Sequence, residues 1–128
     1  MPTASSFDYA IVRVVPLVER GEFVNVGVIL FCRPLRFLGA RMMESGAERP
    51  KSLAPGLDVT MLQGQLDLIP RLCAGGDGAG PIGRLSQAER FHWLVAPRST
   101  IVQISPVHCG LCTDPQAALD SLFEKLVA

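Results

Sequence analysis

Two neighbouring segments near the start of the chain, residues 7–15 and 23–32, restrict the fold more than any other feature of the sequence. The first reads FDYAIVRVV and is followed by Pro16, and the second reads FVNVGVILFC. Runs that are rich in β-branched and aromatic residues and bounded by proline or glycine are typical of β-strands. Residues 19–21 (ERG) supply a turn signal between the two runs. The sequence therefore predicts an antiparallel hairpin.

The remaining segments predict further strands and helices around this hairpin. Strands are expected at residues 37–43 and 100–105. Residues 57–73 carry an apolar stripe at helical spacing, made by Leu62, Leu66, Ile69 and Cys73. A capping box at residues 86–89 (SQAE) predicts a short helix, and an Asp-Pro pair predicts a longer one at residues 115–127. The expected fold is α+β, with a mainly antiparallel four-stranded sheet in chain order β-β-β-α-α-β-α and helices packed on one face.

Composition limits the class of protein to which the chain belongs. A length of 128 residues predicts a single domain, with residues 1–6 as a loose tail and the Gly-rich residues 74–83 as a flexible linker. Twelve basic and twelve acidic residues cancel, so the whole molecule is not expected to attract nucleic acid or anionic membrane. No stretch is typical of a signal peptide or a membrane helix, and the four cysteines are expected to be reduced thiols of a cytoplasmic protein.

Strand alternation divides the predicted hairpin into two faces. The apolar face is expected to lie buried under the helices and consists of Ala10, Val12, Val14, Val24, Val26, Val28 and Leu30. Arg13 and Asn25 then emerge together on the opposite face, because a one-residue slip in register would bury Arg13. Gly27 follows Asn25 on that face and leaves bare backbone that a ligand or another chain can approach.

The predicted ligand or partner face therefore consists of Arg13, Asn25 and Gly27, with Arg98 as a further candidate. The planar guanidinium of arginine suits a carboxylate or a phosphate. Arg98 lies in a loop (APRST) just ahead of a predicted strand, and loops often carry binding residues. The structural alternative is that Arg13 pairs with Asp8 or Glu22 and that Arg98 is an ordinary solvated loop residue.

Residues 108–112 (HCGLC) contain a CxxC pair. A structural zinc site needs four ligands, and the sequence has no second pair at a suitable spacing, so no metal is expected. The pair stands just ahead of a predicted helix, as in redox motifs, but no strand follows to complete a thioredoxin-like unit. The favoured interpretation is that Cys109 and Cys112 are two thiols with no metal-binding or redox role.

No other motif predicts a catalytic set or a cofactor. Residues 75–83 lack the lysine and hydroxyl residue that end a phosphate-binding loop, and no serine, histidine and acid can be assigned as a triad by spacing. Arg33, Arg36 and Arg41 form a small basic cluster that a solvated edge strand explains. A nucleic-acid-associated protein that uses residues 33–41 is a third and the least favoured hypothesis, because aromatic residues do not interleave with this cluster.

Two blocks, residues 7–32 and 90–127, resemble the opening and closing signatures of an uncharacterised bacterial family, a domain of unknown function. Genes of that family are often found beside one for a HipA-like kinase, which the resemblance suggests as a partner; it supplies no catalytic residues. The favoured hypothesis is a non-catalytic binding or accessory module. The alternative is a small enzyme or ligand-binding domain that holds an anionic group with Arg13, Asn25 and Arg98.

Overall fold

A computed structural model describes residues 3–15, 22–44, 56, 58–96 and 101–128. Within these residues the strands are β1 (Ser5–Val14), β2 (Val24–Cys32), β3 (Phe37–Met42), β4 (Val102–Ile104) and β5 (His108–Cys112). The helices are α1 (Val59–Ala74), α2 (Gln87–Val95) and α3 (Pro115–Leu126), and two short 3₁₀ turns, η3 (Asp77–Ala79) and η4 (Pro81–Arg84), join α1 to α2. The predicted α+β class with a mainly antiparallel sheet is confirmed.

The local signals that predicted the last two helices operate as expected. Ser86 Oγ accepts from the Glu89 backbone N–H at 3.2 Å, and Glu89 Oε1 accepts from the Ser86 backbone N–H at 3.3 Å. Asp114 accepts from two backbone N–H groups in the first turn of α3, and Pro115 occupies the first helical position. Both helices therefore begin where side-chain oxygens satisfy backbone donors that would otherwise lack partners.

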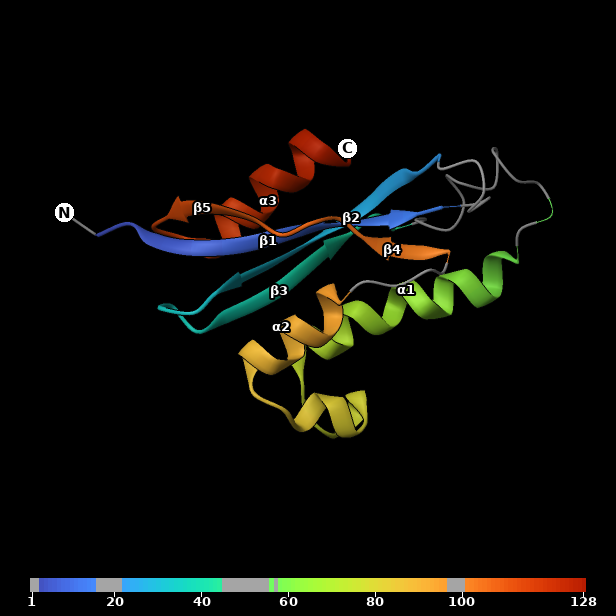
Figure 1. The fold of residues 1–128 in the computed structure, drawn as a ribbon, viewed down its shortest axis with the longest axis horizontal. Helices are drawn as coiled ribbons and strands as arrows, with labels where there is room; N and C mark the ends of the chain where they lie inside the picture. The colour runs from blue at the N-terminus through green and yellow to red at the C-terminus, as the bar shows by residue number, and fades with distance from the viewer. Residues whose placement is uncertain (1–2, 16–21, 45–55, 57, 97–100) are drawn as a thin grey trace.

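The sheet is built around β1, which pairs with β2 on one side and with two strands on the other (Figure 1). The end of β1 pairs with β4, as in Val12 with Ile104, and its beginning pairs with β5, as in Tyr9 with His108. The expectation of four strands is thus corrected to five. β4 ends just before Pro106, and the residues that follow return to the same edge of β1. Residues 108–112 have little β propensity of their own, so they form a strand because they pair with that edge.

Helices cover both faces of the sheet, which corrects the expectation that they pack on one face. In Figure 1, α3 lies on one side of the sheet and α1 and α2 lie on the other. One core cluster joins strand residues such as Ile29 and Phe31 to α1 and α2, and the second joins Val28 and Leu30 to α3. β2 is apolar on both faces along most of its length, so burial requires a layer on each side.

A β-bulge in β2 changes which residues share a face. Val12 pairs with Gly27, whereas Arg13 pairs with Asn25, so Val26 is an extra residue without a partner on β1. Alternation is therefore shifted beyond this point: Val26 packs toward α1, and Val28 packs toward α3. The expected single apolar face of β2 is wrong for this reason, since a bulge places one extra residue in one strand of a pair.

Candidate functional site

The structure brings Arg13 and Asn25 together, as the predicted register requires. They are direct partners on β1 and β2, and Val12 and Val14 on either side of Arg13 pack in the core beneath α1 and α2. Arg13 and Asn25 therefore share the α3 side of the sheet. The Asn25 side-chain amide donates to the Leu126 carbonyl oxygen at 3.0 Å, which fastens the end of α3 to β2.

The Arg13 guanidinium stacks on an aromatic ring. Its Cζ lies 4.2 Å from the ring centroid of Phe23, and 49% of Phe23 is exposed. The Nε atom of Arg13 is buried, and no acceptor for it exists among the described residues. Within the same part of the chain no ion pair reaches Arg13, and Asp8 lies on the opposite face, so a pairing of these two residues does not occur.

The other two residues of the predicted face have different surroundings. The space above Gly27 is filled by the Met42 side chain, and the carbonyl oxygen of Arg41 would lie 3.1 Å from an added Cβ. Met42 belongs to the core beneath α1, so Gly27 is turned away from Arg13 and Asn25. Because Gly27 has no side chain, the space beside its backbone is occupied by the side chain of Met42. Arg98 lies outside the described residues.

The CxxC pair lies in β5, where its two thiols point to opposite faces. Cys109 is exposed and pairs with Asp8, whereas Cys112 packs in the α3 core together with Cys32. Burial, and then the neighbouring Cys32, raises the pKa of the Cys112 thiol. A raised pKa is the reverse of what a reactive thiolate needs. All four cysteines are free thiols, and no group of three potential ligands that could hold a metal lies within the described residues.

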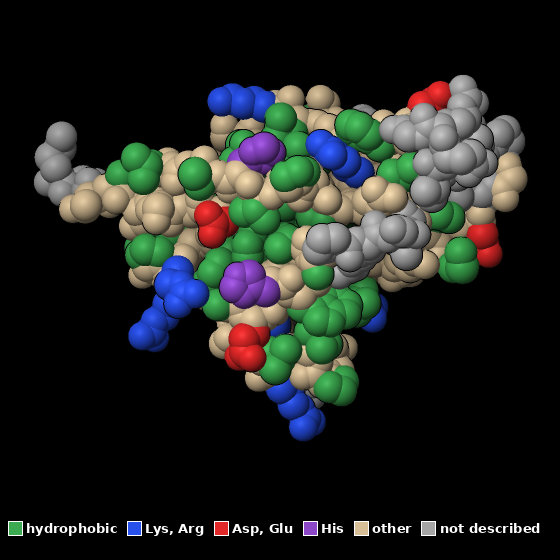
Figure 2. All heavy atoms as spheres, in the orientation of Figure 1, with side chains coloured by type: hydrophobic (Ala, Val, Ile, Leu, Met, Phe, Trp, Pro, Cys, Tyr) green, Lys and Arg blue, Asp and Glu red, His purple; other side chains and the backbone are tan. Residues whose placement is uncertain are grey.

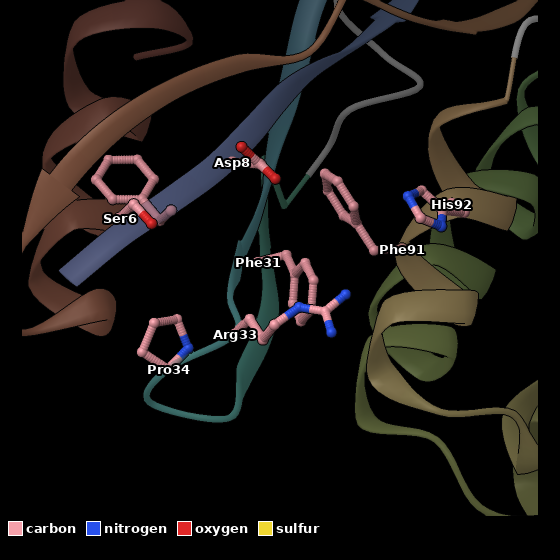
Figure 3. Close-up of a pocket in the computed structure, with 8 residues that line it drawn as sticks. Ser6, Asp8, Phe31, Arg33, Pro34, Phe91 and His92 are labelled. Atoms are coloured by element: carbon pink, nitrogen blue, oxygen red, sulfur yellow. The ribbon is translucent and has the colours of Figure 1, made fainter.

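A cavity between β1, β2 and α2 gathers polar side chains that lie far apart in the sequence. Its volume is about 230 Å³, and its polar lining comes from Ser6 and Asp8 on β1, Arg33 after β2, and His92 on α2. These side chains surround the Phe31 and Phe91 rings, whose centroids are 5.3 Å apart (Figure 3). Figure 2 shows the same area as hydrophobic surface bordered by basic, acidic and histidine side chains.

A second cavity adjoins the first and extends it along α2. Its volume is about 460 Å³, and it shares Phe31 and Arg33 with the first while adding Arg36, Gln87 and their neighbours. Because both cavities are lined by Phe31 and Arg33, they lie side by side, and we call them together the Phe31 groove. Its rim is polar, and its aromatic floor is formed by the edges of the Phe31 and Phe91 rings, which are 7% and 3% exposed.

The rim at the far end of this groove is held in a fixed conformation. The turn between β2 and β3 is closed by a hydrogen bond from the Arg36 N–H to the Arg33 carbonyl oxygen at 3.1 Å. Arg36 has a left-handed backbone with φ of 52°, and its carbonyl oxygen accepts from the Gln87 side-chain amide at 2.9 Å. Helix α2 therefore holds the turn in place, with both arginines beside the groove.

The basic cluster expected at Arg33, Arg36 and Arg41 is divided by the fold. Arg41 pairs with Asp120 at 3.2 Å and with Glu124 at 3.5 Å, both on α3. Arg33 and Arg36 are exposed and take part in no ion pair within the described residues. The sequence gives no signal for the groove itself, because its walls come from three elements and no motif unites them.

Comparison with known proteins adds a family to this description. Residues 9–127 match a family model described as "Protein of unknown function (DUF3037)". The chain belongs to this family. The match covers both blocks that carry the resemblance to an uncharacterised domain, apart from the first two residues of the opening block. No curated protein and no solved structure matches the chain. Within the described residues no helix is long and apolar enough to cross a membrane.

Proposed function

We propose that the domain is a non-catalytic binding module that holds a segment of a partner protein in the Phe31 groove. The observation that carries this proposal is the pair of arginines, Arg33 and Arg36, fixed beside an aromatic floor without acidic partners in the described part of the chain. Aromatic rings that lie within a polar rim are the usual anchor points of protein interfaces.

The arrangement of the polar groups favours binding over catalysis. Ser6 and Asp8 lie on β1 and His92 lies on α2, and no hydrogen bond among the described residues joins any two of them. An activated nucleophile requires a base within hydrogen-bond reach, held in turn by a third group. The groove offers separate charges around an apolar centre, which suits the recognition of side chains.

The proposed partner is a HipA-like kinase, on the basis of the gene neighbourhood that the family resemblance implies. We expect a tagged copy of the chain to retain such a kinase from the same genome after co-expression. The variant Arg33→Gln/Arg36→Gln should retain much less, because both groove charges are removed from exposed positions that the fold does not need.

The matched control removes two positive charges elsewhere. Arg71→Gln/Lys125→Gln changes exposed residues on α1 and α3, away from the groove, and should retain the kinase like the wild type. Thermal melts establish that each variant is folded. Equal retention by the groove variant and the control would reject the groove as the site, and no retention by the wild type would reject the kinase as the partner.

A second candidate function is an anion-holding domain that uses Arg13, with Asn25 and Arg98 as accompanying residues. The buried Arg13 Nε without an acceptor in the described residues favours it. We expect Arg13→Ala to abolish binding of an acidic partner at this face while the chain stays folded, with a loss of stability of about 0.5–2 kcal/mol from the cation–π contact with Phe23. Pull-down and thermal melting of the same preparation measure the two effects separately, and unchanged binding by the folded variant rejects this site.

A further inference from the structure

The Phe31 groove carries opposite charges at its two ends. At the β1 end the exposed carboxylate of Asp8 lines the first cavity. Beyond Phe31, Arg33 lines both cavities and Arg36 lines the second, and both residues are exposed. The aromatic floor lies between these ends, so the groove has a negative end, an apolar centre and a positive end.

The geometry of β1 and β2 accounts for this order. Asp8 is the direct cross-strand partner of Phe31, and both line the same cavity. Cβ atoms of directly paired residues lie about 4.5–5.5 Å apart, so the carboxylate stands at the β1 side of the aromatic floor. Arg33 follows Phe31 by two residues, beyond the end of β2, and its guanidinium extends toward α2 (Figure 3). No ion pair joins Asp8 to Arg33.

Other charges near the groove are already engaged within the fold. Glu89, in the first turn of α2, accepts from Ser86 in the capping box. Arg90 is buried and donates to the carbonyl oxygens of Leu85 and Cys73. Among the residues that the structure describes, Asp8, Arg33 and Arg36, with His92 beside them, are therefore the charged and titratable groups that line the groove.

We propose that the groove binds an extended peptide segment of mixed charge, with an acidic side chain at Arg33 and Arg36, an apolar side chain over Phe31 and Phe91, and a basic side chain at Asp8. This inference rests on the proposed function and specifies its ligand. A polyanion such as single-stranded RNA fits less well, because a uniform row of phosphates would place negative charge against Asp8. A single small anion could pair with Arg33 and Arg36 but would leave the carboxylate of Asp8 without a partner.

Short fluorescent peptides with the same apolar centre test this charge order by anisotropy. One set carries glutamate at one end and lysine at the other, in both chain directions; two further peptides carry glutamate or lysine at both ends. The wild type should bind a mixed-charge peptide about 1.4- to fivefold more tightly than either uniform peptide, as expected for exposed ion pairs of about 0.2–1 kcal/mol.

Charge reversal at one end provides the decisive comparison. Asp8→Lys should switch the preference to the doubly acidic peptide, whereas Glu44→Lys, an equal change at an exposed residue after β3, should leave it unchanged. Equal binding of mixed and doubly acidic peptides, unaffected by Asp8→Lys, overturns the charge order but keeps the groove as a protein-binding site. No binding of any peptide, or tighter binding of an RNA oligonucleotide, overturns the proposed function as well.

Discussion

Arginine residues in this domain serve different purposes according to their surroundings. Arg90 is only 9% exposed and donates to the Leu85 carbonyl oxygen at 2.6 Å and the Cys73 carbonyl oxygen at 3.3 Å. It therefore joins the start of α2 to the end of α1. Arg33 and Arg36 are exposed and form no ion pair within the described residues, and the Cζ of Arg33 lies 5.9 Å from the ring centroid of Phe31. A cation that the fold does not use is available to a ligand.

The backbone of Arg36 allows its charge to be removed without loss of stability. A left-handed conformation costs an L-residue about 1–2 kcal/mol, and glycine avoids this cost but loses more chain entropy on folding. Arg36→Gly should therefore leave the free energy of unfolding unchanged or raise it by up to about 1 kcal/mol. Urea denaturation measures this change.

Arg36→Ala is the matched control, because it removes the same charge and keeps the unfavourable φ. The free energy of unfolding of Arg36→Ala should not rise above that of the wild type. Arg36→Gly and Arg36→Ala should nevertheless weaken partner binding equally. A glycine variant that is markedly less stable than the alanine variant would contradict this account of the turn.

Strand alternation predicted the position of some residues of the site correctly and could not predict the position of others. The placement of Arg13 and Asn25 on one face follows from a period of two and the cost of burying a charge, and the structure has both residues on one face. The position of Gly27 could not be predicted in the same way, because the bulge lies between it and Asn25. The roles of Asp8 and His92 depend on β1 and α2 meeting in space, which no local pattern contains.

At the scale of elements, the bulge in β2 allows one strand to serve two cores. Val24 and Val26 contribute to the α1 side, and Val28 and Leu30 contribute to the α3 side. The strand itself and its boundaries were predictable from composition. The bulge was not, because an extra unpaired residue shows only when the partner strand is known.

Gly27→Ala tests this element directly. The added methyl group would contact the Met42 side chain and approach the Arg41 carbonyl oxygen, so we expect a loss of stability of about 1–3 kcal/mol from overpacking. In a Met42→Ala background Gly27→Ala should lower the free energy of unfolding by less, because the space that Met42 fills in the wild type is then available to the added methyl group. A double-mutant cycle by urea denaturation measures this coupling, and additive losses would show that Met42 does not fill the position.

At the scale of the whole molecule, the buried thiol of Cys73 makes stability depend on alkaline pH. Burial raises the pKa of Cys73 from 9.0 to about 12, although the charge of Arg90 acts in the opposite direction. Above pH 9 the unfolded chain loses this proton while the folded chain keeps it, so the unfolded state is favoured as pH rises. The contribution of Cys73 is fully present below pH 9 and is lost up to about pH 12.

We therefore expect the free energy of unfolding to fall more steeply with pH in the wild type than in Cys73→Val. The difference in slope should be up to about 1.4 kcal/mol per pH unit in this range. Urea denaturation at several alkaline pH values measures it, and other titrating groups cancel in the comparison. Parallel curves would show that the thiol ionises equally in both states.

The central position of β1 has a consequence for the chain as it leaves the ribosome. β2 is available early, but the second edge of β1 gains its partners only when β4 and β5 are made near the other end of the sequence. At about 5–20 residues per second, this edge stays open for several seconds of synthesis. An open, apolar strand edge is a template for association between chains. The last strands thus protect the nascent domain from its own neighbours on a polysome.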